Sequence, residues 1–484
     1  MSNQHFHFAI LLYTDSHPII QTFYHSRHTL AAGRIFGCEV QSPAVDAENF
    51  WDKGRTKRLF PMTGIFLSPL SKAYSCQKVC VIGGRLILHR KITSSGQGQT
   101  ARKQGKKNIL IMKFTVSSTA MANKLATMAK VMNNKPALPI LSTFLLEVKE
   151  DAPLEVTASD LECVWHGSLD ITGQEGAGKV CITASTLLDA VRNLPEQPIT
   201  FTIDDKDKSV TIHYLNGHYG MAGFGSDEYP MMQNESDIRF DMDAATLCNS
   251  IDQSLFAVSY DALRPVMTGI NYTISDGKLE CAASDGHKLV RNTYPLAGNA
   301  DDCRFVLSAK AAKIVKLLLH KKEGSVEVEY NGRNIVFKTD TDSFSTRLIE
   351  GTYPNYNAIV PTNSNKEATI DRQALLSAIR RVGVFAERTS RQLVLSFSGM
   401  ALLLTGHDFD NATSAEETVF CTYQGDEVRI AFHAENLKMI LENMDTAEVR
   451  FRMSEACRAA IIEPVSSDVQ SEHLALLMPM MLPE

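Results

Sequence analysis

From residue 112 onward the chain switches between two patterns of hydrophobic and polar positions. In six segments apolar residues recur at i, i+3 and i+4, which predicts amphipathic helices with one buried face. Between them, runs such as TFTID, SVTIHY, SVEVEY and NIVFKT alternate with period two, which is typical of strands with one face buried. Short polar turns separate these runs, so the strands are expected to pair antiparallel.

The same arrangement occurs three times. A short apolar strand, a small polar residue, an alanine and a helix recur at Ile182-Thr183-Ala184, Leu307-Ser308-Ala309 and Phe432-His433-Ala434. The alanines are 125 residues apart, since 309 − 184 and 434 − 309 are both 125. A periodicity of this length predicts repeated structural units.

A second helix is expected to open each unit, over residues 119–132, 243–258 and 371–386. Asp243 and Asp371 stand where a helix N-cap is needed, because their carboxylates can accept the first free backbone N–H groups. Each unit then holds two helices and about eight strands. We predict an α+β protein with domains at 112–234, 235–362 and 363–484, each with two helices packed on antiparallel sheet.

The first 111 residues lack both periodicities. The stretch SSGQGQTARKQGKK at 94–107 resembles a flexible tether. We interpret Met112 as the natural start and 1–111 as a disordered extension or a mis-assigned start. A basic arm that touches nucleic acid, or a small separate domain, remain alternatives.

Charge divides the chain in the same place. Residues 1–111 hold about 15 Lys and Arg and about 5 Asp and Glu, so they carry roughly +10, and the net charge of −6 leaves about −16 for the rest. Any DNA contact by the repeated part must therefore come from a locally basic surface.

Composition favours a cytoplasmic protein. No apolar run is long enough to span a membrane, no secretory signal is evident, and the ten cysteines form no CxxC pair. After residue 112 no histidine or cysteine spacing typical of a metal site and no phosphate-binding GxxxxGK[ST] loop occurs, so we expect no metal, no cofactor and no ATP-driven motor.

Six segments in order resemble one family. They are MKFTV at 112–116, KPALPILS at 135–142, SDLE at 159–162, SDGHKL at 284–289, LIEGTYPNYNAIVP at 348–361 and LLMPMML at 476–482. Over residues 112–482 the chain resembles the beta subunit of bacterial DNA polymerase III, the DNA sliding clamp. The resemblance implies the DNA-clamp fold and a ring-shaped homodimer around duplex DNA. It also implies a processivity factor without catalysis of its own, whose partners are the polymerase III catalytic subunit, the clamp loader and other proteins with a clamp-binding motif.

Helix faces and loops supply candidates for phosphate contact. Backbone contacts carry no sequence information and permit sliding. The candidates on helices are Lys124, Arg192, Lys310, Lys313, Arg380 and Arg381, and by resemblance the loop residues Lys135 and Arg264 join them. Pro265 and Val266 follow Arg264 where relatives often carry aromatic residues, which puts a stacking role of this loop in doubt. An ordinary solvated helix face is the alternative for each residue.

The resemblance places a pocket for partner peptides between the second and third domains. Methionines suit such a surface because their side chains repack easily. The expected walls are Met267, Gly286, His287, Lys288, Leu289, Pro354, Leu477, Met478, Pro479, Met480 and Leu482, and the alternative for the tail is a buried last strand. His433 and Asn436 are weaker candidates, and Pro483-Glu484 departs from the family pattern.

Ring closure requires matching edges. By resemblance Tyr219 and Met221 lie on an edge strand of the first domain, and Val384 and Phe385 end a helix of the third. An open edge strand is a hazard unless another chain pairs with it. Ordinary core packing is the alternative. Two other functions stay open: a DNA-acting enzyme that uses Asp285 and His287, and a clamp-like protein that does not encircle DNA.

Overall fold

The computed structural model describes residues 7–13, 18–24, 79–82, 85–88, 111–232, 237–296, 301–320, 322–465 and 471–482. Most of the segment 1–110, including the tether-like stretch at 94–107, and the Pro483-Glu484 extension lie outside them. The chain divides into two compact units, Met1–Lys106 and Lys107–Glu484.

Two hairpins are described in the first unit. Strand β1 (His7–Tyr13) pairs with β2 (Pro18–Tyr24), and β3 (Val79–Ile82) pairs with β4 (Arg85–Leu88). The sequence analysis did not predict these strands. Their apolar residues stand in unbroken runs such as FAILLY and VCVI, so no period-two alternation marks them.

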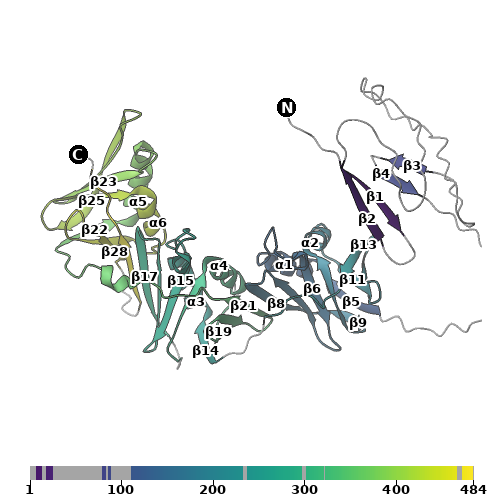
Figure 1. Cartoon of the computed structure of the whole chain (residues 1–484). Coiled ribbons are helices and arrows are strands. Elements are labelled where there is room, and N and C mark those ends of the chain that lie inside the picture. Colours follow the sequence, from purple (N-terminus) through teal and green to yellow (C-terminus); the bar gives the residue numbers. More distant parts are fainter. Residues whose placement is uncertain are drawn as a thin grey trace, which may run out of the picture. The chain divides into compact units, whose positions relative to one another are not determined.

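The second unit contains the three predicted repeats, each with a pair of neighbouring helices (Figure 1). The helices are α1 (Ser118–Met128), α2 (Ala184–Arg192), α3 (Ala244–Leu255), α4 (Ala309–Leu318), α5 (Arg372–Val382) and α6 (Ala434–Glu442). All six predicted helices are present. The opening ones end three or four residues early, because the chain turns into short 3-10 bonds, as at Gly383–Phe385 after α5.

Side-chain caps fix the helix starts. The Asp243 carboxylate accepts from the Thr246 N–H at 2.8 Å and Asp371 accepts from the Ala374 N–H at 2.7 Å, as the sequence predicts. Ser308 does the same for Ala311 N–H at 3.1 Å. In the third repeat His433 occupies the cap position without a side-chain bond to the helix.

The strands form one sheet across each junction between repeats. The first repeat supplies β5 (Ile111–Ser117), β6 (Thr143–Val148), β7 (Leu154–Ser159), β8 (Cys163–Leu169), β9 (Thr172–Glu175), β10 (Gly178–Thr183), β11 (Pro198–Asp204), β12 (Ser209–Tyr214) and β13 (Gly217–Phe224). The second supplies β14 (Ile238–Asp243), β15 (Gly269–Ser275), β16 (Lys278–Ser284), β17 (Lys288–Pro295), β18 (Cys303–Ser308), β19 (Ser325–Tyr330), β20 (Asn334–Lys338) and β21 (Asp342–Arg347). The third supplies β22 (Lys366–Asp371), β23 (Gln392–Ser398), β24 (Ala401–Asp408), β25 (Thr413–Gln424), β26 (Val428–His433), β27 (Glu448–Met453), β28 (Ala460–Pro464) and β29 (Glu472–Leu477).

Two antiparallel strand pairs join the repeats. A 13-stranded sheet continues from the second repeat into the first through β21 and β8, and a 12-stranded sheet continues from the second into the third through β17 and β29. We call these places junction 1–2 and junction 2–3. The apolar faces of helices and strands form one large core cluster through all three repeats.

Candidate functional site

The tail and the SDGHKL turn meet at junction 2–3. Lys288 at the start of β17 is the partner of Leu477 at the end of β29. Beyond that pair the Met478 N–H donates to the His287 carbonyl at 2.9 Å, and the Met480 N–H donates to the Ala431 carbonyl at 2.8 Å. The last residues therefore run from the turn of the second repeat to β26 of the third.

The turn itself is held by Asp285. Its carboxylate accepts from the backbone N–H groups of His287 and Lys288 at 2.8 and 2.9 Å and from Lys288 Nζ at 2.5 Å. Burial alone would raise the pKa of the Asp285 carboxyl, but these hydrogen bonds outweigh it and the pKa is lowered. An Asp with all these bonds shapes a turn, so nothing in this geometry favours its use as an acid or base.

Glycine is required within this turn. Gly286 has φ +94°, a conformation that other residues rarely adopt, and an added Cβ would lie 3.2 Å from Arg264 Nη1. Arg264 itself pairs with Asp261 at 2.9 Å and donates to the Asp285 carbonyl at 3.4 Å. The structure therefore places Arg264, a predicted DNA contact, on the rim of the turn.

Polar groups line one side of this site. Lys288 is buried and its Nζ donates to Asn436 Oδ1 of α6 at 3.2 Å, which ties the second repeat to the third. Among the described residues, His433 Nδ1 is buried without a hydrogen-bond partner. Burial and the nearby Arg391 cation lower the pKa of His433, which favours the neutral ring.

Apolar side chains line the other side. Met478 is 42% exposed and Met481 is 92% exposed, while Pro479, Met480 and Leu482 are half-buried. Met267 is buried at the base of its loop and Pro354 is exposed. The predicted tail thus forms an open apolar surface rather than a fully buried last strand.

Leu289 and Leu477, two expected walls of the site, are both buried. Successive side chains of a strand point to opposite faces, so Leu289 points away from its neighbour Lys288. It packs with Ile461, Leu474 and Leu476 in a separate cluster, which Tyr356 of the inter-repeat connector covers. Leu477 is 1% exposed and belongs to the main core.

Two lysines that were predicted to contact DNA instead form ion pairs across junction 1–2. Lys124 Nζ binds both carboxylate oxygens of Asp342, at 2.8 and 2.9 Å, and its side chain is only 16% exposed. Lys310 Nζ binds the Asp160 carboxylate and Asn133 Oδ1. Both lysines were expected to face phosphates. Helical spacing indicates a face of a helix, but it does not reveal a carboxylate on the next repeat.

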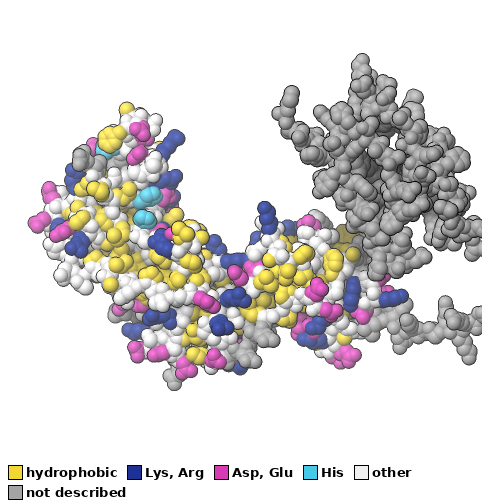
Figure 2. Space-filling model, in the orientation of Figure 1, with side chains coloured by type: hydrophobic (Ala, Val, Ile, Leu, Met, Phe, Trp, Pro, Cys, Tyr) yellow, Lys and Arg dark blue, Asp and Glu magenta, His cyan; other side chains and the backbone are white. Residues whose placement is uncertain are grey.

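The remaining cations differ in how far they are paired. Lys135, Arg192 and Lys313 are exposed, and the described part of the chain offers none of them an ion pair. Arg380 pairs with Glu442 at 2.8 Å and Arg381 with Glu417 at 2.5 Å, both at exposed positions. Figure 2 shows Lys and Arg interspersed with Asp and Glu on the visible face, so the basic character is local.

Strand β13 has a half-open edge. Its residues from Gly217 to Ala222 pair with β12, whereas only Gly223 and Phe224 pair with β10. Tyr219 and Met221 point toward the core, where the Tyr219 ring lies 4.8 Å from that of Tyr214. Both side chains are therefore half-buried against the core, and the backbone edge beside them is open along Gly217–Ala222.

The third repeat offers a matching feature. Val384 and Phe385 follow α5 and are 77% and 41% exposed. Next to them, β25 pairs with β24 through Thr413–Phe420 and with β22 only beyond that, so its first part also has one unpaired edge among the described strands. Two strand edges and an apolar pair are thus available for assembly.

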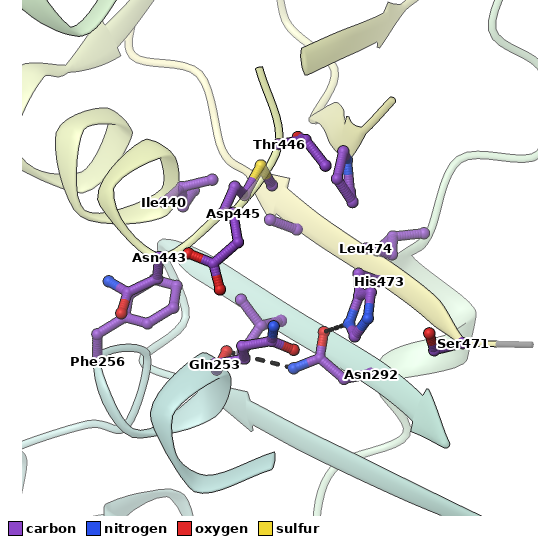
Figure 3. Close-up of a pocket in the computed structure, with 14 residues that line it drawn as sticks. Gln253, Phe256, Asn292, Ile440, Asn443, Asp445, Thr446, Ser471, His473 and Leu474 are labelled. Carbon is purple, nitrogen blue, oxygen red and sulfur yellow. Dashed lines mark hydrogen bonds between the residues drawn. The ribbon is translucent and has the colours of Figure 1, made fainter. Parts of the chain in front are cut away.

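The sequence analysis missed a cavity on the helix side of junction 2–3 (Figure 3). It has a volume of about 250 Å³ and lies between the ends of α3 and α6, over β17 and β29. It also missed Tyr260 and Leu263, which are 86% and 90% exposed on the loop before Arg264. No sequence motif marks the cavity or these two exposed side chains.

Neither a membrane-spanning helix nor a metal-binding group of His, Cys, Asp or Glu occurs in the described residues.

Family models match the whole repeated part. The N-terminal, central and C-terminal domain models of the DNA polymerase III beta subunit match residues 112–233, 241–355 and 357–481 in order. Together they span about three quarters of the chain, because 122 + 115 + 125 is 362 of 484 residues.

Individual relatives agree with this assignment. A beta sliding clamp of Synechococcus elongatus is 24% identical over 366 residues, which cover 73% of this chain and 96% of that protein. One of Vibrio cholerae is 22% identical over 358 residues, covering 74% of this chain and 97% of that protein.

Solved structures show the same fold. A sliding clamp from Pseudomonas aeruginosa superposes with a TM-score of 0.73 at 24% identity, covering 77% of this chain and all of that one. One from Bartonella birtlesii has a TM-score of 0.71 at 25% identity with the same coverage. With three matching domains, a continuous sheet across both junctions and the expected fold, the chain belongs to the DNA polymerase III beta subunit family, the sliding clamps that make this polymerase processive.

Proposed function

We propose that two copies of this chain close into a ring around duplex DNA and tether the polymerase III catalytic subunit and other partners to it. The observation that carries the proposal is the threefold repeat with continuous sheet across both junctions and unpaired strand edges in the first and third repeats. When unpaired strand edges lie in the first and the last repeat, the edge of one copy can pair with the opposite edge of a second copy. Two such pairings would close a ring. The domains then correspond to 112–234, 235–362 and 363–484.

Ring closure would use backbone pairing and apolar contact together. We assign the open part of β13, which carries Tyr219 and Met221, to pairing with the open part of β25 from the second copy. Val384 and Phe385 would be covered in the same contact. Covering two large exposed apolar side chains gives such a contact a hydrophobic contribution of about 25 cal/mol per Å².

The DNA contacts would be few and indifferent to sequence. Arg192, Lys313, Arg380 and Arg381 stand at exposed helix positions, and Lys135 stands on a loop. Cations that already exchange with Glu442 or Glu417 hold a phosphate weakly, which suits a ring that must slide. Retention would come from topology, and such a ring needs no catalytic activity of its own. A protein with this role works where the chromosome is, so we place it in the cytoplasm.

Partner peptides would bind at the tail. We assign this role to Met267, Gly286, His287, Lys288 and Pro354 together with Met478, Pro479, Met480 and Leu482. The surface combines flexible apolar side chains with the orienting groups of His287 and Lys288, the chemistry of a short-peptide site. Clamp loaders and polymerases would then compete for one surface.

Retention on DNA tests the ring. Protein loaded on nicked circular DNA should elute with it in gel filtration and should be released when the circle is cut once. Retention on linear DNA with free ends would contradict the proposal, because a ring slides off. The purified protein should show no nuclease or ATPase activity under the same conditions.

Two variants separate assembly from partner binding. Val384→Glu combined with Phe385→Glu should shift the dimer to monomer in analytical ultracentrifugation, because charge replaces apolar contact. Met478→Ser with Met480→Ser should abolish binding of a clamp-binding peptide and leave the dimer intact. Met400→Ser is a matched control, since Met400 is 63% exposed on the β23–β24 turn. A monomer in the tail variant would mean that the tail has a structural role instead.

A further inference from the structure

The cavity on the helix side of junction 2–3 is lined by apolar and polar side chains in about equal numbers. Phe256 just after α3, Val290 of β17 and Ile440 of α6 contribute apolar surface. In Figure 3 the Asp445 carboxylate extends from the end of α6 toward Gln253 of α3. Its volume of about 250 Å³ lies below the 300–1,000 Å³ of sites for drug-sized molecules, so its ligand must be small.

The internal repeat shows what fills the corresponding space at junction 1–2. With the 125-residue offset, Trp165 corresponds to Val290. The Trp165 side chain is buried, and its indole N–H donates to Asp342 at 2.8 Å. The same carboxylate binds the ammonium of Lys124. An indole and an ammonium therefore occupy that junction together.

Junction 2–3 lacks each of these groups. Val290 replaces the indole. His473, which lies opposite Asn292, takes the strand position that Asp342 has opposite Gly167. The seventh residue after the helix N-cap is Lys124 in α1, but it is Ser250 in α3. The cavity is the space that the smaller side chains leave.

The walls of the cavity are fixed before any ligand binds. Asn292 Nδ2 donates to the Gln253 carbonyl at 3.2 Å, and the Tyr294 hydroxyl donates to Gln253 Oε1 at 2.6 Å. On the other side the Arg372 guanidinium donates to the carbonyls of Thr446 and Leu441 at 2.7 and 3.1 Å, which fixes the turn that carries Asp445. A preorganised site loses less entropy on binding.

Asp445 supplies the missing charge. It is exposed, and no Lys or Arg of the described residues pairs with it. The Asp445 carboxylate therefore lines the cavity from the turn after α6, and it has no bound Lys or Arg among the described residues.

We propose that this cavity is a binding site for a small planar aromatic amine, with its ring against Phe256, Val290 and Ile440 and its ammonium beside Asp445. Such a ligand supplies the indole and the cation that Trp165 and Lys124 provide at junction 1–2. It would contact α3, α6 and both strands of the junction, so its binding would stiffen the connection between the second and third repeats.

Tryptamine is the probe, because it carries an indole and an ammonium in one small molecule. Calorimetric titration into the full-length protein should show saturable binding of one molecule per chain. Asp445→Asn should weaken it by roughly fivefold, as expected for one exposed ion pair. Asp410→Asn, at an exposed loop acid, should leave it unchanged, and indole-3-acetate, whose charge is reversed, should not bind.

Val290→Trp is the sharper variant. It installs the side chain of the first repeat at the corresponding position, so it should fill the cavity and abolish tryptamine binding. Absence of binding to the unmodified protein at up to roughly 5 mM tryptamine would overturn the proposal. Equal binding by the Asp445→Asn variant, or undiminished binding by a folded Val290→Trp variant, would also overturn it. If Val290→Trp does not fold, the Asp445→Asn variant and the indole-3-acetate titration test the proposal.

Discussion

The two junctions between repeats use the same strand pairing but different chemistry. Junction 1–2 is crossed by two reciprocal ion pairs, Lys124 with Asp342 and Lys310 with Asp160, and each pair has at least one well-buried partner. At junction 2–3 the buried cation, Lys288, pairs with Asp285 of its own repeat and crosses only to the neutral amide of Asn436. No Lys–Asp pair of the described residues crosses that junction.

This difference indicates that junction 1–2 mainly holds two repeats together, whereas junction 2–3 offers surfaces for binding. A buried ion pair contributes little net stability, because desolvation offsets the attraction, but it tolerates only one geometry. The two ion pairs of junction 1–2 therefore favour one angle between its repeats. Junction 2–3 carries both the proposed peptide surface and the cavity. Four changes test whether the contrast holds.

Lys124→Met should have the largest effect. It leaves the Asp342 carboxylate, which is 13% exposed, with only the Trp165 indole and the Thr341 hydroxyl as donors. We expect the free energy of unfolding to fall by about 3 kcal/mol in urea denaturation followed by circular dichroism. Lys316→Met is the matched control, because its pair with Asp252 is half exposed and should contribute nothing measurable. Equal losses of stability in Lys124→Met and Lys316→Met would show that the ion pair at junction 1–2 is no more important than an exposed one.

Asp160→Asn should cost less. The Asp160 side chain is 3% exposed and accepts from the backbone N–H groups of Glu162 and Cys163 at 3.0 and 2.6 Å, which an amide oxygen can still do. Only the Lys310 pair is lost, and that ammonium can turn to solvent. A decrease of about 1–2 kcal/mol in the free energy of unfolding is expected. A loss as large as that in Lys124→Met would show that the turn, not the ion pair, had been broken.

Lys288→Met probes the second junction. Asp285 keeps two backbone N–H bonds, so the free energy of unfolding should fall by only about 1 kcal/mol. Binding of a clamp-binding peptide should weaken in the same variant, whereas Lys124→Met should leave peptide binding intact. Fluorescence anisotropy of a labelled peptide distinguishes them. The contrast fails if both variants lose peptide affinity equally.

The smallest expected effect is one of pH. The pKa of His433 is lowered from 6.5 by burial and by Arg391, Lys288 and His287, against an opposing contribution from Glu435. The unfolded chain therefore takes up a proton at His433 before the folded protein does. This group reduces stability progressively as pH falls below about 6.5, and the loss is complete below its folded pKa.

Comparing unfolding at pH 7.5 and 5.5 checks this expectation. His433→Asn should narrow the gap between the two free energies of unfolding. His166 in β8, whose pKa burial also lowers, should account for part of what remains. An unchanged gap in the His433→Asn variant would mean that the ring is already solvated.

Periodicity along the chain was sufficient for the repeats, the six helices and the caps at Asp243 and Asp371, because these depend on residues within one or two turns. It could not reveal the partners of Lys124 and Lys310, which are carboxylates 218 and 150 residues away in sequence. The position of Leu289 follows from period-two alternation once Lys288 is known to face the tail. The cavity had no signal in the sequence, because it depends on which side chains of α3, α6, β17 and β29 come together in the fold.

The tail also has a consequence for solubility. Strand β26 is the last strand of the 12-stranded sheet. Among the described residues its outer edge contacts only the tail, through the bridge between Met480 and Ala431, and Gln392 Nε2 donates to the Met481 carbonyl at 2.5 Å. A ligand that displaced the tail from β26 would expose the unpaired backbone N–H and C=O groups of that strand. Strands of other molecules could then pair with this edge. Inhibitors that bind over the tail should therefore leave the protein soluble, whereas inhibitors that displace the tail should promote aggregation.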